Sequence, residues 1–442
     1  MDNIENKQVT RRRFMRNSAM AAAGLGSVLA GCKARKVEEK EPNAVEPEVS
    51  KIPKKEEYPQ VPRRKLGKTG VDVPVLALGT MFNLIDNQIV LRSTLKYGVK
   101  YWDTAHSYAG GNSELGIGKY LEKNPEARKN LFLVTKASRA KNREQWEERL
   151  QTSLERMNTD HIDLYYAPHA ASDPAQLTDE LKQWAEDAKK RELIRFFGFT
   201  THQNMAKCLA AAAKLGWIDV IMPAYNFRIM QDPEMPAAIE ACHKANIGLI
   251  AMKTTGKTTL KRFKQAIETE TDKKLVEHFL QRGFTPEQAC IKLVLEDERI
   301  SCAAVQMENI SVLTQNVAAV LDKTKFTEAD KEIFRQYARA TCDGYCAGCS
   351  DICDSALRKS ARGRLTAESI GLPDVPCVSD IMRYLMYYNS YGEQDKARGL
   401  FAKIPRKVRN KLLTTDYTLA EARCPQHLPI AKLVAEAVSK LA

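Results

Sequence analysis

Short apolar runs alternate with amphipathic segments from residue 62 onwards, and this alternation limits the possible folds more than any other feature. Such an alternation predicts strands that are each followed by a helix, and therefore a parallel sheet. The predicted strands are Val75–Gly79, Val99–Asp103, Leu131–Lys136, Ile162–Tyr166, Ile194–Phe199, Val220–Met222, Ile247–Met252 and Ser301–Val305.

The amphipathic segments between these runs are predicted to be helices. They are Asp86–Lys96, Asn112–Glu122, Arg143–Met157, Pro174–Lys190, His202–Leu215, Glu234–Ala245, Pro286–Glu296 and Asn309–Leu321. Eight strands, each followed by a helix, are the repeat of a (β/α)8 TIM barrel, so the predicted fold class is α/β. A doubly wound open sheet is the alternative, and it is disfavoured because no Gly-x-Gly-x-x-Gly pattern follows a strand.

The charge balance is basic but dilute. The chain has 68 Lys and Arg residues against 55 Asp and Glu residues, a formal net charge of +13, and five of the basic residues lie within the first 16 positions. Hydrophobic residues make up 44% of the chain, a proportion that excludes a wholly disordered protein. A surplus spread over so many charges predicts no nucleic-acid partner.

The first 32 residues are predicted to be an export signal. The apolar run Ala19–Ala30 is too short to span a bilayer. Arg11-Arg12 with Phe14 resembles a twin-arginine signal, and Leu29-Ala30-Gly31-Cys32 resembles a lipobox. The resemblance implies twin-arginine export of a folded, cofactor-loaded protein to the cell envelope or periplasm, with a lipid anchor at Cys32. A disordered basic tail that ends by chance in a cysteine is the alternative.

Residues 33–61 are predicted to be a disordered tether, because they contain Pro, Glu and Lys but almost no large apolar side chains. The barrel is then expected over residues 62–325. Residues 326–442 are expected to form a second, mostly helical module, with helices at Glu328–Ala340, Val378–Asn389, Glu393–Ala402 and Ile430–Leu441.

Polar residues lie where the second, third and fourth predicted strands end. Asp103 ends the second strand and Tyr108 follows it, Lys136 ends the third, and His169 follows the fourth. In a parallel barrel the carboxyl ends of all strands meet at one rim, where the chemistry takes place. Taken singly, each residue also has an ordinary explanation as a helix cap, a solvated lysine or a packed aromatic side chain.

Several long segments around these residues resemble the aldo-keto reductase family. The resemblance covers residues 63–320. It rests on Leu66-Gly67-Lys68-Thr69-Gly70, WDTAHSYAGGNSELGIGKYL (102–121), LVTKAS (133–138), HIDLYYAPHA (161–170) and IRFFGFTTH (194–202).

The resemblance implies catalysis by Asp103, Tyr108, Lys136 and His169. Reduction of a carbonyl by hydride needs a proton donor, and a tyrosine is a poor acid–base group at neutral pH without a neighbouring cation. Lys136 is expected to be that cation, held by Asp103, while Tyr108 is the general acid and His169 orients the carbonyl. His169 lies one position later than the family pattern Asp-Leu-Tyr-x-x-His.

The resemblance also implies a nicotinamide cofactor, NADP or NAD. Its expected site comprises Gly79, Thr80, Thr200, Thr201, Tyr225, Met252, Lys253 and Asn316. The chain departs from the family pattern here, because Thr200-Thr201 replaces a Ser-Asn pair, Met222 replaces a Gln, and Met252 replaces a stacking aromatic residue. Residues 306–316 contain no Lys or Arg to bind a 2′-phosphate, which disfavours NADP.

Six of the eleven cysteines lie beyond the predicted barrel. Cys342-x3-Cys346-x2-Cys349-x3-Cys353, with the remote pair Cys424-Pro425, resembles a ferredoxin-type [4Fe-4S] pattern. The implied ligands are Cys342, Cys346, Cys349 and either Cys353 or Cys424, in a ferredoxin-like module. A buried helical stripe, disulfides and a structural zinc are alternatives, and Gly344 and Gly348 oppose the helix.

Two functions follow from these features. The first is an exported oxidoreductase that acts on a small carbonyl or alcohol substrate, with an iron–sulfur module that serves an electron-transfer partner. The second is a degenerate, non-catalytic barrel that acts as a binding or scaffold protein with a disulfide-linked C-terminal tail. Cys208, Cys242, Cys290 and Cys302 lie in barrel elements and are expected to be small buried apolar residues.

Overall fold

The computed structural model describes residues 58–255, 270–340, 346, 352–353, 356–357, 378–389, 394–424 and 428–442. The chain divides into two units, Met1–Glu56 and Glu57–Ala442, and all the elements below belong to the second. The predicted signal, including Cys32, lies outside the described residues, as do Cys342 and Cys349.

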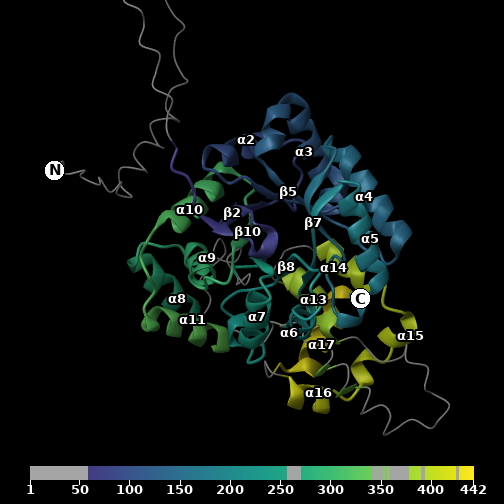
Figure 1. Cartoon of the computed structure of the whole chain (residues 1–442). Helices are drawn as coiled ribbons and strands as arrows, with labels where there is room; N and C mark the ends of the chain where they lie inside the picture. The colour runs from purple at the N-terminus through teal and green to yellow at the C-terminus, as the bar shows by residue number, and fades with distance from the viewer. Residues whose placement is uncertain are drawn as a thin grey trace, which may run out of the picture. The chain divides into compact units, whose positions relative to one another are not determined.

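Eight parallel strands close into a barrel in the order β10-β3-β4-β5-β6-β7-β8-β9. This confirms the predicted TIM-type barrel, and Figure 1 shows its strands inside a ring of helices. Each observed strand overlaps a predicted one. Their bounds are β3 Leu76–Gly79, β4 Tyr101–Asp103, β5 Phe132–Lys136, β6 Ile162–Tyr166, β7 Ile194–Thr201, β8 Val220–Pro223, β9 Gly248–Ala251 and β10 Cys302–Gln306.

The helices that surround the barrel also follow the predicted pattern. Their bounds are α2 Gln88–Lys96, α3 Asn112–Lys123, α4 Arg143–Met157, α5 Asp179–Lys190, α6 Met205–Ala212, α7 Met235–Lys244, α9 Pro286–Glu296 and α10 Ile310–Leu321. The predicted helix 174–190 is divided, because Asp173 caps a 3-10 turn at Pro174–Gln176 and Thr178 caps α5 separately. An additional helix, α8 Glu270–Gln281, precedes α9.

A short antiparallel hairpin covers the amino end of the barrel. It consists of β1 Arg63–Lys65 and β2 Asp72–Pro74. Leu66, in the hairpin loop, is fully buried in the cluster that fills the barrel interior. Gly67 has a positive φ of 49°, and a Cβ there would lie 2.3 Å from the backbone nitrogen of Gly248. Glycine is therefore required for the hairpin to approach β9 this closely.

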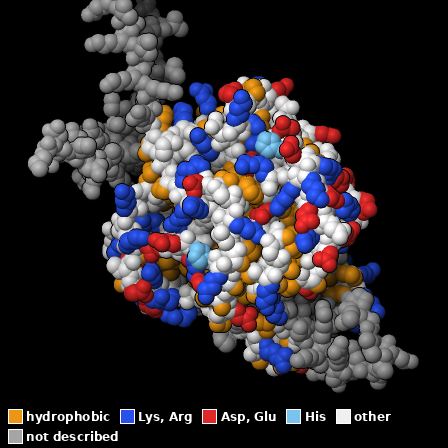
Figure 2. Space-filling model, viewed as in Figure 1, with side chains coloured by type: hydrophobic (Ala, Val, Ile, Leu, Met, Phe, Trp, Pro, Cys, Tyr) orange, Lys and Arg blue, Asp and Glu red, His pale blue; other side chains and the backbone are white. Residues whose placement is uncertain are grey.

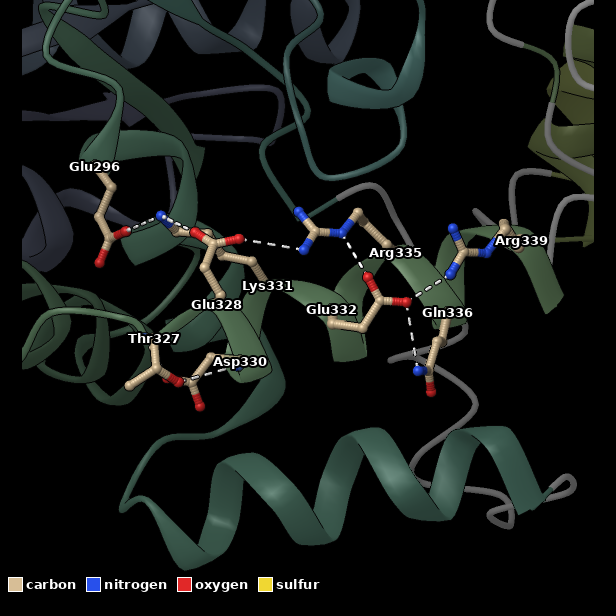
Figure 3. A network of polar contacts seen from close by, with 9 residues as sticks. All are labelled: Glu296, Thr327, Glu328, Asp330, Lys331, Glu332, Arg335, Gln336 and Arg339. Atoms are coloured by element: carbon tan, nitrogen blue, oxygen red, sulfur yellow. Dashed lines mark hydrogen bonds and ion pairs between the residues drawn. The ribbon is translucent and has the colours of Figure 1, made fainter.

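Helix α11 (Glu328–Ala340) extends the fold beyond the barrel and packs on α8 through a shared aromatic cluster. Asp330 is fully buried; its carboxylate accepts a hydrogen bond from His278 at 2.7 Å and is paired with Arg282 at 3.3 Å. The exposed face of α11 carries a chain of ion pairs that includes Arg335–Glu332 at 2.7 Å (Figure 3). Asp330 thus joins the barrel to the segment that follows it.

The remaining C-terminal elements form a helical cluster with its own apolar core. They are α13 Val378–Asn389, α14 Gln394–Phe401, α15 Arg406–Arg409, a 3-10 turn at Leu412–Thr414, α16 Thr418–Arg423 and α17 Ile430–Leu441. The described part of this segment contains helices and no strand, which agrees with a mostly helical module. Its likeness to ferredoxins stays a prediction.

The visible surface carries basic and acidic side chains interspersed over the same face (Figure 2). None of the helices in the described ranges is long and apolar enough to cross a membrane.

Candidate active site

Asp103 and Lys136 form a buried ion pair at the carboxyl rim of the barrel. They end the neighbouring strands β4 and β5, which run parallel. The Lys136 Nζ lies 2.6 Å from Asp103 Oδ2 and donates a second hydrogen bond, also 2.6 Å, to the Thr104 carbonyl. Both side chains are almost completely buried. A buried ammonium needs such a partner, and this is the pair predicted from the sequence.

Tyr108 and His169 join this pair from the loops after β4 and β6. The Lys136 Nζ is 5.0 Å from the centre of the Tyr108 ring. The Tyr108 and His169 rings meet edge to face with centroids 6.2 Å apart. The four residues, here called the rim tetrad, therefore converge as predicted, and the shifted spacing of His169 still brings its ring to Tyr108.

A buried carboxylate, that of Glu114, helps to hold the loop that carries Tyr108 in place. Glu114 is fully buried and accepts hydrogen bonds from Thr135 and Ser153, each 2.7 Å. Its second oxygen pairs with Arg156 at 3.1 Å, and Arg156 also donates to the His106 carbonyl at 2.9 Å. This network ties the loop to α3 and α4 and fixes where Tyr108 stands.

The electrostatics of the rim tetrad keep its groups in defined protonation states. Burial raises the pKa of Tyr108, and the Lys136 ammonium opposes that rise. Burial would lower the pKa of Lys136, but Asp103 and Tyr108 outweigh it and raise the pKa. Burial, then Lys136 and Arg139, lowers the pKa of His169 to about 3. At neutral pH the tetrad thus contains a neutral phenol, an ammonium and a neutral imidazole.

The predicted cofactor residues lie on the ends of β3, β7 and β9, after β8 and on α10. Thr80 donates to the Asp103 carbonyl at 2.9 Å, so its hydroxyl supports the rim. Thr200 accepts from the Ala170 backbone at 2.8 Å, and Thr201 donates to the Ala171 carbonyl at 2.8 Å. These two hydroxyls hold the loop that carries His169.

Two further members of the predicted cofactor set lie in very different surroundings. The Tyr225 hydroxyl donates to Asp297 at 2.7 Å, and Asp297 pairs with Arg299. That hydroxyl therefore belongs to an ion network outside the rim tetrad. The Asn316 side chain on α10 is buried, and its Nδ2 has no hydrogen-bond partner among the described residues. Gly79 ends β3, while Met252 and Lys253 follow β9.

Helix α13 reaches the rim from the C-terminal cluster, a placement that the sequence did not reveal. Gln203, which follows β7, donates to Ser379 at 3.1 Å and to Asp380 at 3.3 Å at the start of α13. Burial first, and Tyr387 of α13 to a lesser extent, raise the pKa of Tyr108. Burial, Lys253 and Arg383 of α13 together hold the pKa of His202 well below its ordinary value.

The described cysteines divide into two groups. Cys353 and Cys424 are buried in the core of the C-terminal helical cluster, and Cys346 packs against the same core. Among the described residues no group of three His, Cys, Asp or Glu side chains is placed to hold a metal ion. Cys208, Cys242, Cys290 and Cys302 are buried, and burial raises the pKa of each thiol, which suits small apolar core residues.

A second hydroxyl network lies beside His169 and was missed by the sequence analysis. The Ser138 Oγ is 3.0 Å from His169 Nδ1, and Ser107 donates to Ser138 through both its backbone nitrogen and its hydroxyl. Ser138 lies in the segment LVTKAS, two residues after Lys136. That position on the rim is the signal that could have identified it.

Comparison of the sequence with known proteins relates this chain to one family. A model described as the aldo/keto reductase family matches residues 77–335. An aldo-keto reductase of Schizosaccharomyces pombe, whose name specifies NADP(+), is 27% identical over 219 residues, or 45% of this chain and 62% of the relative. An uncharacterized oxidoreductase of Bacillus subtilis is 25% identical over 42% of this chain and 64% of its own length. The match thus spans less than two thirds of either relative.

Longer and structural matches agree with this result. An L-galactose dehydrogenase of Arabidopsis thaliana is 23% identical over 281 residues, 59% of this chain and 88% of the relative. The crystal structure of a thermostable aldo-keto reductase shares the fold with a TM-score of 0.52 and 24% identity, covering 63% of this chain and all of that one. The holo form of an aldo-keto reductase from Bacillus halodurans has the same TM-score at 20% identity, covering 64% of this chain and 98% of that one.

Proposed function

The chain belongs to the aldo/keto reductase family, and we propose that it transfers a hydride between a nicotinamide cofactor and a carbonyl or alcohol carbon at the rim tetrad. The observation that carries this proposal is the convergence of Tyr108, the Lys136–Asp103 ion pair and His169 at one end of the barrel. These groups supply what carbonyl reduction needs besides a hydride: a proton donor, a fixed positive charge and a hydrogen bond to the oxygen.

In the proposed reduction, Tyr108 donates its proton to the substrate oxygen as negative charge develops there. The nearby Lys136 ammonium stabilises the resulting phenolate, and Asp103 holds the ammonium in place. His169 orients the oxygen with a neutral ring, since its pKa is about 3. Because burial raises the pKa of Tyr108, the phenol is protonated at neutral pH and is ready to act as an acid.

The residues of this chain fit a nicotinamide cofactor in one specific respect. Asn316 has a buried amide whose Nδ2 is without a partner among the described residues, and a buried donor of this kind calls for an acceptor. When bound, the cofactor supplies the hydride in reduction or takes it in oxidation. Gly79, Lys253 and Asn316 would hold it, while Thr200 and Thr201 keep the loop beside it in place.

The charge around α10 favours NAD over NADP. Residues 306–316 contain no Lys or Arg. A 2′-phosphate bound there would lose charge-assisted hydrogen bonds worth about 1.5–3 kcal/mol each. The Schizosaccharomyces pombe relative is named for NADP(+). Titration of this chain with both dinucleotides tests the preference, and we expect the smaller dissociation constant for NAD(H).

The test of the function is the Tyr108→Phe variant, which removes the proposed proton donor and leaves the ring. Its matched control is Tyr120→Phe on α3, which removes a phenol hydroxyl whose ring packs on Trp102 and is not part of the rim tetrad. Turnover of small aldehydes and ketones is expected to fall at least a hundredfold in Tyr108→Phe, with dinucleotide binding unchanged. Wild-type protein that binds neither NAD(H) nor NADP(H) at millimolar concentration would favour the non-catalytic, scaffold function.

We further propose export by the twin-arginine route and anchoring through a lipid on Cys32, which would place the barrel in the cell envelope or periplasm. The support is the motif Arg11-Arg12 with Phe14 and the segment Leu29-Ala30-Gly31-Cys32. Radiolabelled palmitate should be incorporated by the wild type and not by Cys32→Ala. Replacement of Arg11-Arg12 by two lysines should retain the unprocessed chain inside the cell.

We also propose a [4Fe-4S] cluster, ligated by Cys342, Cys346, Cys349 and either Cys353 or Cys424, that exchanges electrons with a partner. The support is the cysteine spacing, together with the burial of Cys353 and Cys424 in one apolar core against which Cys346 packs. Iron and sulfide analysis of anaerobically purified protein should give about four of each per chain. Iron-free protein with no free thiols in this segment would instead establish disulfides, and stoichiometric zinc would establish a zinc site.

A further inference from the structure

Ser138 lies between Ser107 and the His169 ring of the rim tetrad. The Ser107 backbone N–H donates to Ser138 Oγ at 3.2 Å, and the Ser107 hydroxyl donates to the same oxygen at 2.9 Å. On its other side, Ser138 Oγ lies 3.0 Å from His169 Nδ1. Ser138 is buried, so its environment is set by these neighbours and not by solvent.

The single proton of the Ser138 hydroxyl fixes the direction of its hydrogen bond with His169 Nδ1. A serine hydroxyl has one proton to donate and two lone pairs that accept. Ser107 uses both lone pairs of Ser138 Oγ, so the single Ser138 proton is left for His169 Nδ1. A ring nitrogen that accepts a hydrogen bond carries no proton of its own. The proton of the neutral imidazole is therefore on Nε2.

We propose that Ser138 is a positioning residue that holds His169 as the Nε2–H tautomer, so that Nε2 donates to the substrate oxygen. This inference rests on the proposed function for its catalytic consequence, although the tautomer itself follows from the three contacts of Ser138. The ring stays neutral because its pKa is about 3. A neutral donor polarises the oxygen without competing with Tyr108 to deliver a proton.

The first test measures the tautomer directly and needs no substrate. Protein labelled with ¹⁵N-histidine contains seven histidines, and the His169 signals are assigned by their loss in His169→Gln. In the wild type, Nδ1 of His169 is expected at the chemical shift of an unprotonated nitrogen and Nε2 at that of a protonated one, unchanged between pH 6 and 8. In Ser138→Ala the two shifts should move towards each other as the tautomers mix.

The second test separates positioning from simple support of the fold. Ser138→Ala should lower kcat about three- to tenfold, the value of one hydrogen bond, while KM changes less than twofold. Ser138→Thr retains the hydroxyl and should restore most of kcat. The matched control is Ser301→Ala, because Ser301 is equally buried but donates to the Lys65 carbonyl beside the hairpin β1–β2.

Two results would overturn the proposal. One is a wild-type His169 with the proton on Nδ1, and the other is an unchanged tautomer and unchanged kcat in Ser138→Ala. If no carbonyl is reduced by the wild type while the Nε2–H tautomer is observed and depends on Ser138, the proposed function fails and the proton assignment stands. If Ser138→Thr does not fold, the comparison of wild type with Ser138→Ala still decides.

Discussion

Removal of Lys136 is predicted to destabilise the protein more than the loss of an ordinary surface charge. At a separation of 2.6 Å and an effective dielectric constant of about 20, the attraction between Lys136 and Asp103 is about 6 kcal/mol. Part of this attraction offsets the free-energy cost of removing both charges from water. In Lys136→Met the Asp103 carboxyl remains buried without its cation, and we expect the free energy of unfolding at pH 8 to fall by about 3–5 kcal/mol.

The pH dependence of this loss follows from the direction of the pKa shift. Burial raises the pKa of Asp103 above its ordinary value, and the Lys136 ammonium opposes this rise. In Lys136→Met this opposing charge is lost. Between the unfolded and folded pKa values the native state binds the extra proton, so stability falls as pH rises through that window. Lys136→Met should therefore be most stable at low pH and approach its full loss above the folded pKa of Asp103.

The double variant Asp103→Leu/Lys136→Met provides the decisive comparison. Replacement of a whole buried ion pair by apolar groups is often neutral or stabilising, so the double variant should recover most of the stability lost in Lys136→Met. Turnover should be absent from both, because each lacks the cation beside Tyr108. Urea unfolding at several pH values measures the stabilities. A double variant no more stable than Lys136→Met, or a Lys136→Met protein with wild-type turnover, would refute the reasoning.

Three other predictions concern parts of the fold outside the rim tetrad. Asp330→Asn should lower the free energy of unfolding by about 2–3 kcal/mol at pH 7. Burial would raise the pKa of Asp330, but hydrogen bonds from Thr327 and His278 outweigh burial and lower the pKa. The difference in stability between wild type and Asp330→Asn should therefore vanish as pH falls through the folded-state pKa of Asp330, which urea unfolding at a series of pH values measures. Gln203→Ala should speed hydrogen exchange of α13 about threefold to tenfold, whereas Gln315→Ala on α10 should not. Gly67→Ala should lower the melting temperature more than Gly399→Ala, where an added Cβ meets nothing within 4 Å.

The sequence predicted the barrel well because its strands are buried on both faces and therefore stand out as apolar runs. Helices such as α4 and α9 were predicted to the residue, since Asn142 and Thr285 mark where each begins. The hairpin β1–β2 was missed because strands of three residues are too short to show a period. Helix α8 was also missed, although its charged residues and buried Leu275 and Phe279 have helical spacing.

The rim tetrad could be predicted because its members follow successive strands, and a parallel barrel brings such positions together. Ser138 could be placed at the rim by its position two residues after Lys136, but its contacts could not be predicted, since they depend on two other loops. The position of α13 beside the rim also could not be predicted from the sequence. Gln203 and Ser379 are 176 residues apart, and their contact is a property of the tertiary structure.

The hairpin β1–β2 limits the direction from which a substrate can reach Tyr108. Leu66 and Val73 fill the amino end of the barrel, so small molecules must approach Tyr108 from the opposite end. Helix α13 lies at that end, where Gln203 donates to Ser379 and Asp380. A helix more than 200 residues downstream of Tyr108 therefore lies beside the catalytic end of the barrel, and removal of the C-terminal segment should alter which substrates are turned over.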